Sequence, residues 1–193
     1  MYDWQLTQKL EAFLNGSPAC VRLRQCSLGD QLPSTFSLPR ASLGRQKEWF
    51  TSRRLEAEIR EDLAQKGSVD SDSIFTSVSH TRYCDEIWTC VVGAGIRVGV
   101  DLEVASRVVD PHIARRVISP TETHWKLSLL EFWVVKESIF KANPTNTGTF
   151  LSQYTVTSWN EVTREGEVKL SEVHGLFKLI QIGPWQIAFA YTV

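Results

Sequence analysis

The sequence has no long hydrophobic run and no excess of charge of either sign. No apolar stretch reaches the roughly 20 residues that a helix needs to cross a bilayer. Residues 1–16, MYDWQLTQKLEAFLNG, lack the basic start and apolar centre of a secretory signal, and they include an acid, Asp3. The formal net charge is −1, so nothing draws the whole chain to nucleic acid or to an anionic membrane. We therefore expect a cytoplasmic protein with no membrane and no nucleic-acid partner.

Cysteine spacings typical of metal or redox sites are also missing. No C-x-x-C pair occurs, and the histidines do not stand at zinc-finger spacings. Because an isolated cysteine usually behaves as a small apolar residue, we expect buried free thiols. The cysteines are Cys20, Cys26, Cys84 and Cys90.

What is present is an ordinary globular composition with helical and strand-like segments. The chain has 193 residues, 42% of them hydrophobic, which allows one large domain or two small lobes with cores of their own. Apolar periodicity predicts helices over 3–14 and 45–66, and strand-like segments follow. GAG at 93–95 predicts a hairpin-type turn into a strand at 96–103.

A second set of elements follows this strand. SPTE at 119–122 and SLLE at 128–131 are capping boxes, and each predicts a helix start. NP at 143–144 predicts the end of the second helix. The remaining chain is strand-rich, with turns predicted at HG, 174–175, and GP, 183–184.

The order of these elements predicts the fold class. Helices and strands come first, and a second set of helices and strands comes after them. We expect an α+β fold with an N-terminal lobe over residues 1–95 and a C-terminal lobe over 96–193, acting as one functional unit.

One predicted strand carries two acids. In RVGVDLEVASR, 97–107, Asp101 and Glu103 stand two residues apart, and alternate residues of a strand point to the same side of a sheet. On the helix after 128, Glu137 and Lys141 are four residues apart and share a face. An ordinary surface pair, which contributes only about 0.2–0.5 kcal/mol, is one interpretation of that spacing. The other is an oxygen-lined site for Mg²⁺ with a lysine that reaches a phosphate.

Two N-terminal segments have residues suited to phosphate. SVSHTR, 77–82, places Ser79 and His80 at the end of a predicted strand. Residues 38–54 concentrate basic side chains, whose charge-assisted hydrogen bonds contribute about 1.5–3 kcal/mol each. A solvated helix face is the alternative for the basic group, and a structural role is the alternative for His80. The basic residues are Arg40, Arg45, Lys47, Arg53 and Arg54.

These motifs together resemble the signature of the 4′-phosphopantetheinyl transferase superfamily. Its members carry a G-[IV]-D-[IVL]-E strand and, later, a W-x-x-K-E-[AS]-x-x-K helix. VGVDLE at 98–103 and WVVKESIFK at 133–141 are similar to both, in the same order, and SVSHT and GRQKEWFTSR resemble two further family elements. The resemblance covers roughly residues 38–142, and Ile118 and Val134 depart from the family pattern at packing positions.

The resemblance implies a fold and a reaction. The fold is that of the two-lobed monomeric type, with two similar α/β lobes related by pseudo-twofold symmetry and the active site at the lobe interface. The reaction transfers 4′-phosphopantetheine from coenzyme A, the co-substrate, to a serine of an apo acyl or peptidyl carrier protein, and it releases adenosine 3′,5′-bisphosphate. The implied cofactor is Mg²⁺, with Mn²⁺ as an alternative.

The resemblance also implies roles for individual residues. Asp101, Glu103 and Glu137 are the expected metal ligands. Glu137 is also the expected general base, directly or through a water, and Lys141 is expected to stabilise the transition state at the pyrophosphate. The expected coenzyme A contacts are Arg40, Arg45, Arg53, Ser79, His80, Lys136 and Lys141.

A partner surface and two other functions complete the sequence-based hypotheses. Carrier proteins of this family are acidic and helical, so Arg107, Arg115 and Arg116 are a candidate docking patch, with a solvated helix face as the alternative. A magnesium nuclease of the D…E-x-K type is disfavoured, because Ala105 stands where that site needs its lysine after Glu103. A homologue that binds coenzyme A without transferring is the remaining alternative.

Overall fold

The computed structural model describes residues 3–27, 32, 41–66, 70, 73–146 and 149–193. The chain is α+β and divides into two compact units, Met1–Gly95 and Ile96–Val193. Among the described residues, no helix has both the length and the apolar character that a membrane span requires.

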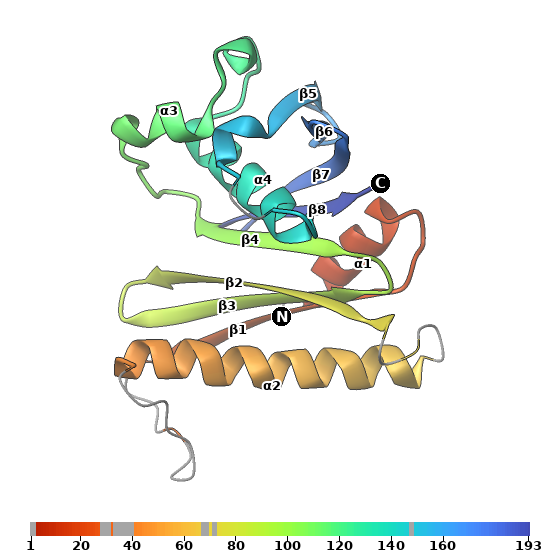
Figure 1. Ribbon diagram of the computed structural model, residues 1–193. Helices are drawn as coiled ribbons and strands as arrows, with labels where there is room; N and C mark the ends of the chain where they lie inside the picture. The colour runs from red at the N-terminus through yellow and green to blue at the C-terminus, as the bar shows by residue number, and fades with distance from the viewer. Residues whose placement is uncertain (1–2, 28–31, 33–40, 67–69, 71–72, 147–148) are drawn as a thin grey trace. The chain divides into compact units, whose positions relative to one another are not determined.

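The described residues of the N-terminal unit form a three-stranded antiparallel sheet and two α-helices. Strands β1 (Ala19–Ser27), β2 (Phe75–Tyr83) and β3 (Glu86–Ala94) are ordered β1-β3-β2. Helix α1 (Asp3–Phe13) precedes β1, and the long helix α2 (Leu43–Gln65) lies along one face of the sheet (Figure 1).

Helix α2 packs through the apolar stripe that the sequence predicts. Leu55, Ile59 and Leu63 are buried in one cluster with residues of β1 and β3. Gly93 on β3 permits the close approach, because a Cβ atom there would lie 2.4 Å from Cγ2 of Ile59. At the other end of the helix, Ser42 is the N-cap and accepts a hydrogen bond from the backbone N–H of Arg45.

The prediction of a hairpin turn at 93–95 is wrong. Gly93 and Ala94 belong to β3, and the next strand, β4 (Val98–Val104), pairs with β8 (Trp185–Thr192) in the second sheet. Glycines on either side of a small residue are as suitable for close helix packing as for a turn. The local sequence therefore could not distinguish the two. The prediction of free thiols is confirmed, but their burial is confirmed only in part. Cys20 and Cys90 are buried, Cys26 is half-buried and Cys84 is exposed.

The C-terminal unit contains a five-stranded antiparallel sheet in the order β4-β8-β7-β6-β5. The prediction of a turn at HG is wrong, because His174 and Gly175 lie inside β7, whereas Gly183, at φ 55°, makes the predicted turn before β8. The remaining strands are β5 (Thr155–Asn160), β6 (Glu165–Leu170) and β7 (Val173–Ile182). The short helical turns are η2 (Pro111–Ile113), α3 (Ala114–Val117), η3 (Pro120–Glu122) and η4 (Leu151–Gln153).

Helix α4 (Leu129–Ala142) lies on this sheet, over β4, β8 and β7. Small residues on the strands allow the contact. A Cβ atom at Gly99 would lie 1.8 Å from the carbonyl oxygen of Ser138, and one at Gly175 would lie 2.0 Å from Cδ1 of Ile139. The face of the sheet is therefore shaped to receive the backbone of α4, which fixes the side chains that the helix presents to β4.

Both predicted capping boxes are present. At the start of α4, the N–H of Glu131 donates to Oγ of Ser128 at 3.2 Å, and the N–H of Ser128 donates to the Glu131 carboxylate at 2.7 Å. The helix ends at Ala142, before Asn143. The box of Ser119 and Glu122 starts only the 3₁₀ turn η3, and the Glu122 side chain also has partners elsewhere in the unit.

Candidate functional site

Asp101 and Glu103 lie on the face of β4 that α4 covers. All of β4 is buried, and Gly99 faces the backbone of α4. Because side chains alternate along a strand, Asp101 and Glu103 share the face of Gly99. Their residues are 5% and 6% exposed. The strand therefore holds both carboxylates on one buried face of the C-terminal unit.

Helix α4 adds a carboxylate and an ammonium group. Nζ of Lys141 donates to Oδ1 of Asp101 at 2.7 Å and to the carbonyl oxygen of Val100 at 3.0 Å. Glu137 lies one helical turn before Lys141 on the same face. Two elements that are distant in the sequence thus bring the residues of the two motifs together.

The pKa of Glu137 shows that the three carboxylates form one electrostatic group. Burial raises this pKa above its ordinary value near 4.5, and the negative charge of Asp101 raises it further. Lys141 acts in the opposite direction, and Glu103 adds a smaller repulsion. We call Asp101, Glu103 and Glu137 the acid cluster.

The donor chemistry of the acid cluster fits Mg²⁺, which prefers carboxylate oxygens. Two of its carboxylates pair with cations of the protein: Asp101 pairs with Lys141, and Glu103 pairs with Arg107. In the part of the chain that the structure describes, no three His, Cys, Asp or Glu side chains are grouped closely enough to hold a metal ion. A metal at this cluster would therefore require these ion pairs to loosen.

Sequence reasoning missed Gln186, a polar neighbour of the cluster. Gln186 on β8 stands directly opposite Glu103 on β4, so the two side chains share a face of the sheet. Gln186 is 4% exposed, and its Nε2 atom donates to no acceptor among the described residues. Only the strand register reveals the pair, since nothing near Gln186 in the sequence connects it with Glu103.

The expectation that Lys136 contacts coenzyme A does not fit its surroundings. Lys136 is wholly buried, and its ammonium group donates to the carboxylate of Glu122 at 2.6 Å and to the carbonyl oxygen of Val117 at 2.5 Å. Glu122 is equally buried and also accepts the N–H of Val156 at 2.5 Å. Burial lowers the pKa of Lys136. Its contacts are internal and join α4 to the segment before it.

In the N-terminal unit, several predicted phosphate contacts line one pocket of about 230 Å³. Nε2 of His80 lies 3.1 Å from Oγ of Ser52, and Nδ1 lies 3.0 Å from Oγ1 of Thr89. The guanidinium group of Arg53 lies over the ring of Trp49, 5.5 Å from its centroid. We call this the His80 pocket, lined by Arg45, Glu48, Trp49, Ser52, Arg53, Glu56, Val78 and His80.

Two acids balance the charge of the His80 pocket. Arg53 pairs with Glu56 at 2.8 Å, and Arg45 lies 3.6 Å from Glu48. Both arginine side chains are mostly exposed, with 62% and 75% of their surface open to solvent. The carboxylates of Glu48 and Glu56 are mostly buried, whereas the guanidinium groups are open to solvent, so an anionic ligand can reach the guanidinium groups.

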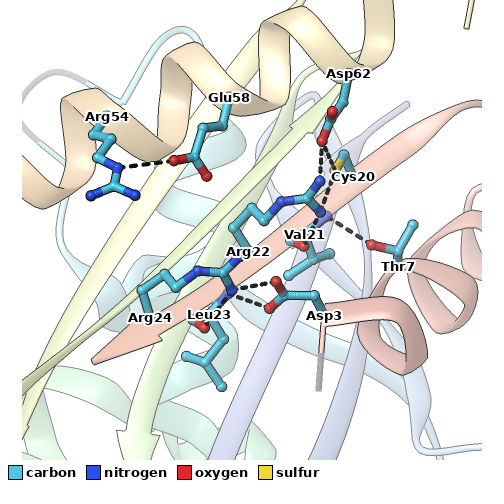
Figure 2. Close-up of polar contacts among 10 residues, drawn as sticks. All are labelled: Asp3, Thr7, Cys20, Val21, Arg22, Leu23, Arg24, Arg54, Glu58 and Asp62. Atoms are coloured by element: carbon cyan, nitrogen blue, oxygen red, sulfur yellow. Dashed lines mark hydrogen bonds and ion pairs between the residues drawn. The ribbon is translucent and has the colours of Figure 1, made fainter. Parts of the chain in front are cut away.

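The other predicted N-terminal contacts lie elsewhere or outside the described residues. Ser79 is next to His80 on β2 and therefore faces the opposite side of the sheet, where it is buried. Lys47 is wholly buried, and its ammonium group donates to the carbonyl oxygen of Ser27 at 2.9 Å. Arg54 pairs with Glu58 at 3.0 Å (Figure 2). Arg40 lies outside the described residues.

The candidate docking patch lies between β4 and α4 in the sequence. Arg107, Arg115 and Arg116 are all exposed. Val108, beside the first of them, is 89% exposed, so an apolar side chain accompanies the basic ones. Arg107 is also the ion-pair partner of Glu103, which connects this segment with the acid cluster.

Comparison with known proteins adds no family name to this description. No family model matches the chain, and no curated protein matches it.

Proposed function

We propose that this chain is a 4′-phosphopantetheinyl transferase, which moves phosphopantetheine from coenzyme A to a serine of an acyl or peptidyl carrier protein. The observation that carries the proposal is the arrangement of the acid cluster. The D-x-E strand and the K-E-x-x-x-K helix, which resemble the family signature, meet in the C-terminal unit, where Lys141 contacts Asp101 at 2.7 Å.

The proposed reaction forms one bond and breaks one bond at the β-phosphorus of coenzyme A. The serine oxygen of the carrier bonds to that phosphorus, and the bond to the bridging oxygen of the pyrophosphate breaks. Adenosine 3′,5′-bisphosphate leaves with that oxygen and its electron pair. Glu137 takes the serine proton directly or, where it holds the metal, through a water. Burial and the charge of Asp101 raise the pKa of its carboxyl group, which favours proton uptake.

Lys141 and the carboxylates have separate roles in this scheme. Lys141 exchanges its contact with Asp101 for the pyrophosphate, where its charge opposes the negative charge that develops during transfer. Asp101, Glu103 and Glu137 are the residues that would hold Mg²⁺. When bound, the metal would neutralise pyrophosphate charge and orient the leaving group.

The His80 pocket is the proposed site for the 3′-phosphate of coenzyme A. Arg45 and Arg53 supply the positive charge, and His80 with Ser52 supplies hydrogen-bonding groups at the same pocket. The proposal requires both units to contact one coenzyme A molecule, as the two-lobed, pseudo-symmetric members of the family do. It also assigns the exposed patch of Arg107, Val108, Arg115 and Arg116 to the acidic carrier protein.

A coenzyme A-binding homologue without transfer is the second candidate. One observation favours it: Asp101 and Glu103 are each paired with a cation of the protein, so the acid cluster is not arranged as a metal site. Such a protein would use the His80 pocket and leave the acid cluster in a structural role.

Product analysis tests the proposal. The chain is incubated with coenzyme A, MgCl₂ and an apo carrier protein, and adenosine 3′,5′-bisphosphate is measured by liquid chromatography. The transferase releases this product only when the carrier is present, and it releases none when the acceptor serine of the carrier is replaced by alanine. Coenzyme A binding by calorimetry without product, across several unrelated carriers, would support the second candidate.

A further inference from the structure

Among the described residues, strand β1 is an edge strand of the N-terminal sheet, because the order β1-β3-β2 gives it β3 as its one neighbouring strand. The open side of an edge strand presents a row of N–H and C=O groups that can pair with another chain. Here side chains occupy that row. We call this open side the β1 outer edge.

Three residues of α1 bind three N–H groups of the β1 outer edge, as Figure 2 shows for two of them. The N–H of Leu23 donates to Asp3 at 2.8 Å, and that of Val21 donates to Thr7 at 3.0 Å. The N–H of Ala19 lies 3.5 Å from the carboxylate of Glu11, the longest of the set.

The spacing of these contacts is regular. The helix residues are four apart, a rise of about 6 Å. The strand residues are two apart, a rise of about 6.6 Å. Helix α1 can therefore follow the β1 outer edge in the opposite direction and place one side chain at each successive outward N–H group.

Basic side chains occupy carbonyl groups of the same edge. Nη1 of Arg22 donates to the carbonyl oxygen of Val21 at 3.1 Å, and Nη1 of Arg24 donates to that of Leu23 at 3.0 Å. The two guanidinium groups are held by ion pairs, Arg22 with Asp62 of α2 and Arg24 with Asp3 of α1 (Figure 2). These Arg–Asp pairs therefore close the edge and are not a free anion site.

Helix α1 buries few apolar side chains. Its buried residues are Leu6 and Leu10, and Trp4 is 68% exposed. A hollow of about 620 Å³ adjoins it, bounded by residues of α1, β1 and α2 that include Thr7, Arg22 and Gln65. The polar contacts with the β1 outer edge add to the burial of these two leucines in holding α1.

We propose that α1 covers a self-pairing strand edge and thereby keeps the chain monomeric. When α1 withdraws and Arg22 releases the carbonyl oxygen of Val21, β1 pairs in antiparallel fashion with β1 of a second copy. A pairing centred on Val21 is symmetric and sets Ala19 opposite Leu23. It sets Arg22 opposite Cys20, so no arginine faces another arginine across the pair. This inference is independent of the proposed function.

The test is a full-length variant that keeps α1 but removes its edge contacts: Asp3→Ala, Thr7→Val and Glu11→Ala together. The matched control carries Gln5→Ala, Gln8→Ala and Lys9→Ala, which change exposed positions of the same helix. Amide hydrogen exchange reports the edge, and light scattering after size-exclusion chromatography reports the mass. In the edge variant, we expect exchange at Val21 and Leu23 to be at least about tenfold faster in dilute solution. We also expect a dimer as concentration rises.

The control should match the wild-type chain in both measurements. Unchanged exchange at Val21 and Leu23 in the edge variant would show that the α1 contacts do not protect the β1 outer edge. Faster exchange with a mass that stays monomeric up to millimolar concentration would overturn the self-pairing. If the triple variant does not fold, Thr7→Val takes its place in both measurements. It should accelerate exchange at Val21, leave exchange at Leu23, which Asp3 still binds, unchanged, and form more dimer than wild type at high concentration.

Discussion

Lys141 lies 2.7 Å from the carboxylate of Asp101, so the last turn of α4 supplies the cation that balances a buried acid of β4. The carbonyl oxygen of Val100 accepts a second hydrogen bond from the same ammonium group at 3.0 Å. Glu137 lies one turn earlier, and its pKa is raised first by burial and next by the charge of Asp101. Lys141 therefore offsets part of the negative charge of Asp101 and Glu137.

Replacement of Lys141 by methionine should destabilise the chain and strengthen its response to metal. Without the ammonium group, Asp101 and Glu137 repel each other, and we expect a loss of about 1–3 kcal/mol in the free energy of unfolding, since Lys141 is only partly buried. Thermal melting with and without MgCl₂ measures the effect. Mg²⁺ should raise the melting temperature of Lys141→Met more than that of wild type.

Lys126→Met is the matched control for this change. Lys126 pairs with Glu161 at 3.3 Å on the surface, where both side chains are more than half exposed. Such a pair contributes between zero and about 1 kcal/mol. An equal Mg²⁺ response in Lys141→Met and wild type would contradict the role given to Lys141.

Replacement of Gly99 by alanine should displace α4 from β4. The added Cβ atom would lie 1.8 Å from the carbonyl oxygen of Ser138 and 2.8 Å from the backbone nitrogen of Ala142, and a helix backbone cannot yield locally. We expect a loss of about 1–3 kcal/mol or more in urea-induced unfolding. Gly16→Asn is the control, because its backbone has φ +80°, which asparagine tolerates, and open space around it. A loss no larger than the control's would mean that the close approach is unnecessary.

Glu137→Gln should change how stability depends on pH. Burial, and next the charge of Asp101, raise the pKa of Glu137 in the folded chain above its ordinary value near 4.5. The folded state thus binds this proton more tightly than the unfolded state does. Wild type should lose stability as pH rises from about 4.5 through the raised pKa, and Glu137→Gln should not.

Unfolding curves between pH 4 and pH 8 give this comparison. The difference between Glu137→Gln and wild type should favour the variant at the upper end of the range and shrink at the lower end. Glu167→Gln, at an exposed position of β6, should run parallel to wild type throughout. A difference for Glu137→Gln that is constant with pH would show that its carboxylate is not coupled to folding.

Lys136 and Glu122 should behave as a structural pair. Lys136→Met leaves the Glu122 carboxylate buried without its cation, and we expect a loss of about 3–5 kcal/mol. The double variant Glu122→Gln with Lys136→Met removes both charges and should recover most of that loss. Urea unfolding gives the cycle, and coenzyme A affinity of the folded double variant checks the ligand role. A double variant that is stable but no longer binds coenzyme A would restore Lys136 as a ligand contact.

Features that depend on residues close together in the chain could be predicted from the sequence. The capping box of Ser128 and Glu131 needs only residues within one turn, and it is present at the predicted helix start. The shared face of Asp101 and Glu103 follows from the alternation of a single strand. Such features depend on neighbours in the chain, so the sequence contains them in full.

Relationships between distant segments could not be predicted in this way. Gln186 stands opposite Glu103 because β8 pairs with β4. Lys136 can be buried because its ammonium group donates a hydrogen bond to the carboxylate of Glu122. The glycines at 93–95 have the local pattern of a turn, but the order of strands in the two sheets decides otherwise. Sheet order and helix packing are set by the whole chain, and these features depend on them.

The intact mass of a carrier protein tests the central claim most directly. An apo carrier is incubated with the chain, coenzyme A and MgCl₂, beside an EDTA control and the Glu137→Gln variant. We expect the wild-type chain to add the mass of one phosphopantetheine, EDTA to abolish the gain, and Glu137→Gln to slow it by roughly 10²-fold or more. No gain on several unrelated carriers, from a chain that still binds coenzyme A, would contradict the transferase assignment.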